Sequence, residues 1–408
     1  MEKKRCMTLG KFNKKFFYFL LGAIIIKILE FFLLLLFQIP NPEDKNKFTI
    51  LNILSYPFFL SLSESLMMIP NLILQKNIES PKKHLETKET SHSIEYIFNP
   101  NAQSITIKDK IYLFFMSLIK LLSEVLYILY HYFLRTEVNC ANILNHNFKF
   151  EIIIIILLMK ILSKNQYYRH HYLSIIFLIL SGITYFIVEF HVKSIGIFFL
   201  HLLNHILNSF FRALILIYIK GLMKYKYITP YKACYFFGLI NLLIITIILI
   251  ISSFIPCNSE LCKVEYNNKN YFGNIIPIFT IEGLILFLIT IMKTSLLLMN
   301  YIIVNKFTVF HSYFAFQFTY LTCILLLGIT QIDAQIIIAL LIYFVISTFF
   351  LLIFIEIIEI NICNISYYTK KNIIEREIQE TKLIDESNVN NNDIEEVELS
   401  DIESNTIN

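Results

Sequence analysis

Residues 194–218 read SIGIFFLHLLNHILNSFFRALILIY, and this stretch decides the fold class of the chain. A helix needs about 20 mostly apolar residues to cross a bilayer, and the stretch is long enough. On a helix its polar side chains share one arc of about 100°. The residues on this arc are His201, Asn204, His205, Asn208 and Arg212. The pattern therefore predicts a membrane helix whose polar face is turned away from lipid.

The composition of the whole chain is that of a membrane protein. The 408 residues are 56% hydrophobic and 16% charged, and the mean hydropathy is +0.62. Soluble globular proteins carry about 25% charged residues and fewer unbroken apolar runs. We therefore expect an integral, multi-pass membrane protein whose surroundings are the lipid bilayer, with no nucleic-acid partner.

Ten apolar segments are long enough to be transmembrane helices. They are residues 16–37, 50–74, 111–134, 142–162, 172–188, 194–218, 231–254, 275–298, 309–327 and 336–358. The purely apolar part of the fourth segment is short, so this helix is predicted to extend back through Asn145 and His146. The sequence therefore predicts an all-α, polytopic membrane fold.

The distribution of basic residues predicts the orientation of this fold. With the N-tail 1–15 and the polar loop 75–110 in the cytosol, cytosolic segments hold about three times as many Lys and Arg as outer loops. Both termini are then cytosolic, and the tail 359–408 is acidic and disordered at its end. Ten helices of this orientation divide into two inverted five-helix repeats, 16–188 and 194–358, as in many transporters.

Ionisable residues also occur inside other predicted spans, where they usually face the interior of the bundle. They include Lys120 and Glu124, with Tyr127 on the same face, then Glu64, Glu282 and Lys293. Lys120 and Glu124 are four residues apart and equally fit a self-neutralising ion pair, which is the favoured interpretation of Lys27 and Glu30. His and Asn can also serve as hydrogen-bonding contacts between helices. Five polar residues on one arc favour a water-filled pathway instead.

Common sequence motifs of nucleotide-binding, hydrolytic, metal-dependent and redox enzymes are missing from the chain. There is no Walker A sequence, GxSxG, HExxH or CxxC, so no enzyme, metal site or cofactor is expected. Cys257 and Cys262 fall in one predicted outer loop. They fit a disulfide and two free thiols equally well.

Residues 160–188, KILSKNQYYRHHYLSIIFLILSGITYFIV, combine a helix that ends in a basic turn, an aromatic-rich start and an apolar run with one glycine, Gly182. This stretch resembles the fourth and fifth helices of the drug/metabolite transporter superfamily, in its EamA and nucleotide-sugar-transporter-like branch. The polar-striped helix, the basic turn KY…TP and Phe237-Gly238 resemble its sixth and seventh. The end of the tenth span resembles uncharacterised eukaryotic members of this group. The chain departs from the pattern at Ile219-Lys220 and Cys234-Tyr235, where related members often carry acidic residues.

The resemblance, with the polar stripes, predicts a secondary transporter that moves a small polar, anionic solute by alternating access. The expected substrate-binding residues are His201, Asn204, His205, Asn208, Arg212, Lys120, Glu124, Tyr127 and Lys293. Expected carriers of a coupling proton are Glu64, Glu124 and Glu282, or His201 and His205. The arginine and a lysine would hold the anion, and the asparagines would bind its polar parts.

Two other function classes remain open. A membrane-embedded enzyme acting on a lipid-linked substrate would need a cluster of acids or histidines at one membrane face. A non-transporting membrane adaptor would work through the acidic tail. The sequence does not distinguish an endomembrane (Golgi, ER or vacuole) from the plasma membrane, and it allows a homodimer.

Overall fold

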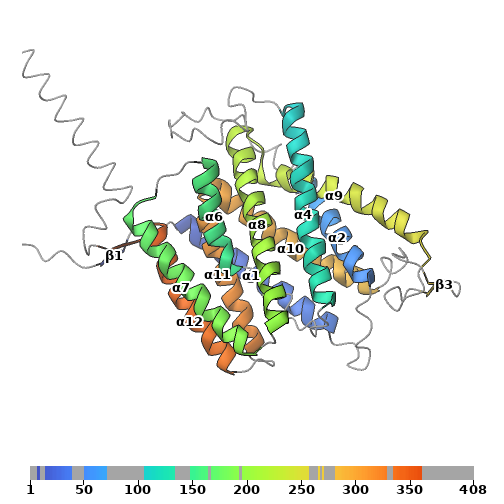
Figure 1. Ribbon diagram of the computed structural model, residues 1–408. Helices are drawn as coiled ribbons and strands as arrows, with labels where there is room; N and C mark the ends of the chain where they lie inside the picture. Colours follow the sequence, from blue (N-terminus) through green and yellow to red (C-terminus); the bar gives the residue numbers. More distant parts are fainter. Residues whose placement is uncertain are drawn as a thin grey trace, which may run out of the picture. The chain divides into compact units, whose positions relative to one another are not determined.

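The computed structural model describes residues 7–9, 14–38, 50–70, 105–133, 148–163, 167–192, 195–256, 265–266, 269–270, 281–328 and 334–360. Within these ranges the chain forms ten helices and two short two-stranded sheets (Figure 1). Each of the ten predicted spans overlaps one of these helices. The all-helical class is confirmed, whereas the inverted repeats and the orientation remain predictions.

The helices follow the apolar segments closely along the chain. They are α1 (Lys14–Gln38), α2 (Ile50–Ser65), α4 (Ile107–Phe133), α6 (Phe148–Ser163), α7 (Arg169–Val192), α8 (Ile195–Tyr225), α9 (Pro230–Ser253), α10 (Ile281–Lys306), α11 (Val309–Gly328) and α12 (Ala334–Phe354). The proposed extension of the fourth span through Asn145 and His146 lies outside the described residues.

Four of the helices contain stretches long and apolar enough to cross a membrane. These stretches are Lys14–Leu33, Leu202–Tyr225, Pro230–Ser253 and Gly283–Lys306. Large apolar side chains point outward from them, such as Phe32 on α1, Leu243 on α9 and Leu284 on α10. Exposed apolar surface of this kind suits lipid and not water. These helices indicate an integral, multi-pass membrane protein.

The start of α4 lies within the segment expected to be loop. The side-chain oxygen of Thr106 accepts a hydrogen bond from the backbone N–H of Asp109 at 3.3 Å. In return, the Asp109 carboxylate accepts one from the backbone N–H of Thr106 at 2.8 Å. This reciprocal pair is a capping box, which satisfies two of the donors that every helix start leaves unpaired. The helix therefore begins before its apolar stretch.

The last helix ends earlier than predicted, at Phe354 instead of residue 358. The backbone N–H of Ile357 bonds the carbonyl of Leu352 at 2.9 Å, and that of Glu356 bonds Ile353 at 3.1 Å. These nested bonds form a Schellman motif, whose central residue adopts the left-handed conformation. Here that residue is Glu356, with φ of 60°. Glycine normally occupies this position because a Cβ makes it strained.

The chain divides into two compact units. Unit 1 comprises residues 1–11, 167–176 and 349–408, and unit 2 comprises residues 12–166 and 177–348. In unit 1, strand β1 (Met7–Leu9) pairs antiparallel with β4 (Ile358–Ile360). The other sheet, β2 (Glu265–Tyr266) with β3 (Lys269–Asn270), is a short hairpin in unit 2.

Unit 2 is a helical bundle with very close packing between α2 and α9. A Cβ added at Gly238 on α9 would overlap the backbone of Ser65 and the side chain of Glu64 on α2. The adjoining core includes the fully buried side chains of Phe237 on α9 and Tyr301 on α10. These contacts bring α2, α4, α8 and α10 together, and their inward polar residues form the site described next.

Candidate functional site

Lys120 on α4 lies at the centre of a group of buried polar side chains in unit 2. Its ammonium group forms an ion pair with the carboxylate of Glu64 on α2, and lies 4.0 Å from that of Glu124 on its own helix. The side chains of Lys120 and Glu64 are 8% and 0% exposed. The Oε2 atom of Glu64 has no hydrogen-bond partner in the described part of the chain. The network is therefore charged, buried and incompletely paired.

The polar arc of α8 meets this group from the next helix. The side-chain amide of Asn208 donates to Asn204 at 2.7 Å, and its oxygen accepts from the hydroxyl of Ser123 on α4 at 2.8 Å. His205 is buried on the same arc, whereas Leu203 on another face of α8 is exposed. Over these turns the helix thus faces its polar side chains inward and exposes apolar side chains such as Leu203 and Phe210.

Arg212, one turn further along α8, has a carboxylate partner from another helix. Its Nε atom lies 3.8 Å from Oε2 of Glu151 on α6, and its guanidinium lies 5.1 Å from the ring centre of Phe316 on α11. The Glu151 side chain is buried. A cation over an aromatic face gains electrostatic attraction, which helps to hold this charge inside the bundle.

Helix α10 contributes the remaining polar contacts. The ammonium of Lys293 donates to the hydroxyl of Tyr56 on α2. The hydroxyls of Ser63 on α2 and Thr294 on α10 lie 2.5 Å apart. The Tyr301 hydroxyl is buried without a hydrogen-bond partner among the described residues. We call the side chains of Glu64, Lys120, Glu124, Asn204, Asn208, Glu151, Arg212, Lys293, Tyr56 and Tyr301 the polar belt.

Most of the predicted site residues belong to this belt, and some lie outside the described part of the chain. The side chains of His201, Tyr127 and Glu282, and both Cys257 and Cys262, are in that second group. Lys27 and Glu30 form the local ion pair that was expected, at 2.7 Å. The interpretation of Lys120 and Glu124 as a pair within one helix is incomplete, because the closer partner of Lys120 is Glu64 on another helix.

Three belt residues were missed by the sequence reasoning: Glu151, Tyr56 and Tyr301. Glu151 opens the apolar run of the fourth span and was counted as part of that run. The two tyrosines are among 24 in the chain, so nothing in their spacing set them apart. An acid at the edge of an apolar run was the one signal available.

A second buried ion pair lies at the start of α4, before the predicted span. The Lys226 ammonium lies 3.0 Å from the Asp109 carboxylate, and their side chains are 1% and 3% exposed. Burial alone would raise the pKa of Asp109. The hydrogen bonds from Thr106 and the charge of Lys226 outweigh it and hold the pKa of Asp109 below its usual value of 3.8.

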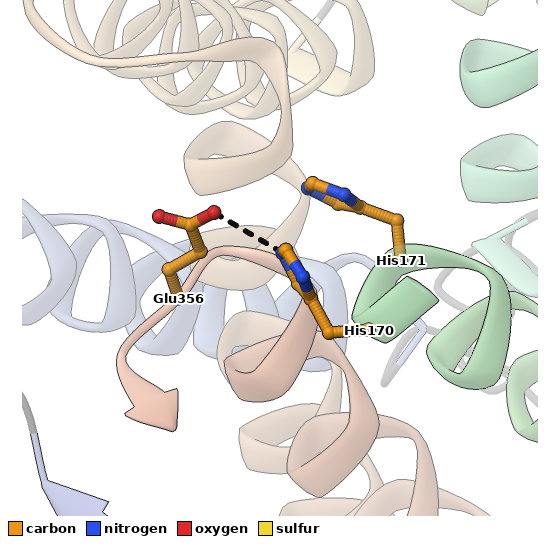
Figure 2. Close-up of side chains that lie close together, drawn as sticks. All are labelled: His170, His171 and Glu356. Carbon is orange, nitrogen blue, oxygen red and sulfur yellow. Dashed lines mark ion pairs between the residues drawn. The ribbon is translucent and has the colours of Figure 1, made fainter. Parts of the chain in front are cut away.

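Unit 1 contains a different cluster, which the sequence reasoning missed. His170 and His171 begin α7, and Glu356 follows α12; their side chains gather in one place (Figure 2). One potential ligand atom from each lies within 4.8 Å of the others. The three residues come from distant parts of the chain, so their spacing in sequence gave no metal-binding pattern.

No protein-family model and no curated protein matches the chain.

Proposed function

We propose that the protein is a secondary transporter that moves a small anionic solute across a membrane, with the fold of the drug/metabolite transporter superfamily that its sequence resembles. The observation that carries the proposal is the ion pair between Lys120 on α4 and Glu64 on α2, buried among helices whose outer surfaces are apolar. Ionisable groups in such surroundings are costly and commonly mark substrate or proton pathways.

Stability alone is a poor reason for these charges. Taking two ions out of water costs several kcal/mol each, and well-packed apolar residues often stabilise a protein as much or more. The belt nevertheless holds three cations, Lys120, Arg212 and Lys293, on three helices. Their spread over several helices supports a site that contacts a ligand from more than one side.

The pairing of Lys120 supports a simple exchange mechanism. A proton that binds Glu64 removes its negative charge and weakens its hold on the ammonium of Lys120. An anionic group of the substrate then takes the place of the carboxylate. When the substrate leaves on the other side, Glu64 loses its proton and pairs with Lys120 again. Proton and anion thus move in the same direction.

Other belt residues have matching roles in this proposal. Arg212, 3.8 Å from Glu151, is a second cation with a carboxylate that an anion can replace. Asn204 and Asn208 offer amide groups to polar parts of the solute. The Tyr301 hydroxyl, buried without a partner among the described residues, is a donor that a bound solute would satisfy.

The first test is a ligand screen by thermal shift on the purified protein. The panel comprises nucleotide sugars, sugar phosphates, nucleosides, amino acids and drugs, and we expect an anionic class to stabilise the protein. Lys120→Gln should abolish the stabilisation. Lys226→Gln is the matched control, because it removes another buried lysine that is bonded to a carboxylate but lies outside the belt.

The second test is uptake of the stabilising compound into proteoliposomes, with and without an inward proton gradient. Wild type should accumulate the compound faster with the gradient, and Glu64→Gln should transport without responding to it. The proposal is wrong if no compound of the panel binds or moves, or if Lys120→Gln and Arg212→Gln transport like wild type.

The same assays separate the other function classes. The acidic tail beyond Arg376 is dispensable for transport under this proposal, whereas an adaptor would lose its activity with that tail. An enzyme at the membrane face would use a cluster there instead of the belt, so its product formation would be insensitive to Lys120→Gln. The pairing of β1 with β4, which places the segments flanking the first and last helices together, supports termini on one side of the membrane.

A further inference from the structure

The cluster of His170, His171 and Glu356 in unit 1 has the composition of a metal site. The Nε2 atom of His170 lies 3.1 Å from Oε1 of Glu356. Around a tetrahedral zinc ion with bonds near 2.1 Å, neighbouring ligand atoms are about 3.4 Å apart. One pair of the cluster already has nearly this spacing, and the third ligand lies within 4.8 Å of both.

The surroundings of His170 point to a missing ligand. Its side chain is only 3% exposed, its Nε2 atom contacts the Glu356 carboxylate, and its Nδ1 atom has no hydrogen-bond partner in the described part of the chain. Buried polar atoms are almost always satisfied, and each exception asks for an explanation. Figure 2 shows its ring directed toward the carboxylate of Glu356, with the His171 ring beside both.

The ring of His171 lies beside that of His170. Its Nδ1 atom accepts a hydrogen bond from the backbone N–H of Tyr168 at 3.1 Å, which places the ring proton on Nε2. A metal ion bound at Nε2 would take the place of this proton, which would move to Nδ1 at the expense of that hydrogen bond. The His170 and His171 rings lie close, with centres 3.9 Å apart. Two imidazole rings this close bring two potential nitrogen ligands into one small space beside the Glu356 carboxylate.

The backbone at Glu356 is strained because the Schellman motif requires a left-handed residue at this position and Glu356 carries a Cβ. Its φ of 60° places a residue with a Cβ where glycine is the usual choice. Strain of this kind persists where the side chain has a use that the favoured residue cannot supply. Here the side chain is the carboxylate that faces His170.

We propose that His170, His171 and Glu356 bind one divalent transition-metal ion of the Zn²⁺ class, which ties the start of α7 to the segment after α12. Imidazole nitrogens suit zinc, copper, iron and nickel, whereas magnesium and calcium prefer sites made of oxygen alone. Three protein ligands leave a further position for water. The site lies outside the polar belt and does not depend on the transport proposal.

The test is a Zn²⁺ titration of full-length protein that carries no polyhistidine tag and has been stripped with a chelator. Binding is followed by competition with a zinc-sensitive dye, and the absorption spectrum of the bound zinc at its X-ray edge reports the ligands. We expect one zinc ion per chain, with imidazole ligands at about 2.0–2.1 Å. His170→Ala and Glu356→Gln should each weaken binding at least about tenfold.

His311→Ala is the matched control for loss of a histidine at a helix start. His311 begins α11 as His171 begins α7, and its Nδ1 atom lies 2.8 Å from the hydroxyl of Thr308. Its removal should leave zinc binding unchanged. Glu356→Gly removes the side chain with its carboxylate and keeps the left-handed helix end in its favoured form, so it tests the site even if His170→Ala fails to fold. The proposal is overturned if stripped wild type binds no zinc, or if Glu356→Gly and Glu356→Gln bind it as tightly as wild type.

Discussion

Lys120 on α4 and Glu64 on α2 form an ion pair across two helices, in addition to the contact of Lys120 with Glu124 on its own helix. The pair therefore links the helices as well as neutralising the charges. A buried ion that loses its partner is left uncompensated in a medium that solvates it poorly, which typically costs about 3–5 kcal/mol. Single and double variants of this pair can therefore show which of its effects concern stability and which concern transport.

We predict that Lys120→Leu destabilises the protein by about 3–5 kcal/mol, and that the double variant with Glu64→Leu recovers most of the loss. Glu64→Leu alone should cost less, because Lys120 keeps its contact with Glu124. The double variant removes both charges and fills the space with apolar groups. Unfolding in a denaturing detergent measures the three stabilities, and the uptake assay should find the double variant inactive. A double variant that is stable and transports normally would contradict the role of the pair.

Asp109 provides a prediction for pH as well as for mutation. Asp109→Asn should destabilise the start of α4 by about 3–5 kcal/mol, because it removes the carboxylate that balances the buried Lys226 ammonium. The folded state lowers the pKa of Asp109. The contribution of this carboxylate to stability is therefore fully present above its unfolded pKa of about 3.9. It is lost as the pH falls below that value and through the folded pKa.

The measurement is the difference in unfolding free energy between wild type and Asp109→Asn over a series of pH values. The difference should be constant near neutral pH and shrink below about pH 4. Thr106→Ala should show a smaller loss, of about 1 kcal/mol, since it removes only the cap. A difference that grows on acidification has the wrong sign for this ion pair.

Gly238 and Gly182 form a matched pair for the close packing of α9. We predict that Gly238→Ala destabilises the bundle by about 1–3 kcal/mol, because the added methyl overlaps Glu64 and Ser65. Gly182→Ala on α7 has nothing within 4 Å of the new methyl. It should be neutral or stabilise by up to about 1 kcal/mol through helix propensity. Equal effects of the two variants on melting would argue against the close approach.

Glu356→Gly should stabilise the metal-free protein by about 1 kcal/mol, because glycine adopts the left-handed conformation without strain. With zinc present the order should reverse. A ligand at about 100 times its dissociation constant adds about 2.7 kcal/mol to the state that binds it, and only wild type retains the site. Thermal melting with and without zinc, and after a chelator is added back, measures both effects.

The helices were predictable because each depends on a local property of the sequence. A long apolar run has few alternatives to a helix in a membrane, and the arc from Asn204 to Arg212 gave the inward face of α8 directly. The ends of the helices were less accessible. The start of α4 depends on a cap formed by Thr106 and Asp109, and the end of α12 on a left-handed Glu356, and both lie beyond what an average over apolar residues detects.

The partners of the polar residues were the part that sequence reasoning could not supply. Lys120 had an obvious neighbour one turn away in Glu124, but its closer partner comes from a helix more than fifty positions earlier. The partner of Arg212, Glu151, is likewise set by how α6 packs on α8. The cluster of unit 1 joins His170 and His171 to Glu356, which lies far away in the sequence. A periodic pattern in the sequence does not report such a contact.

The approach of Gly238 to α2 also limits how the bundle can move. A contact without room for a methyl group favours movement of α2 and α9 as one unit. Glu64 belongs to α2, and its partner Lys120 belongs to α4. An opening motion in the proposed cycle would then keep the acid still and carry the lysine away from it. In the proposed cycle the proton-binding residue Glu64 would stay in place, and the anion-binding residue Lys120 would move.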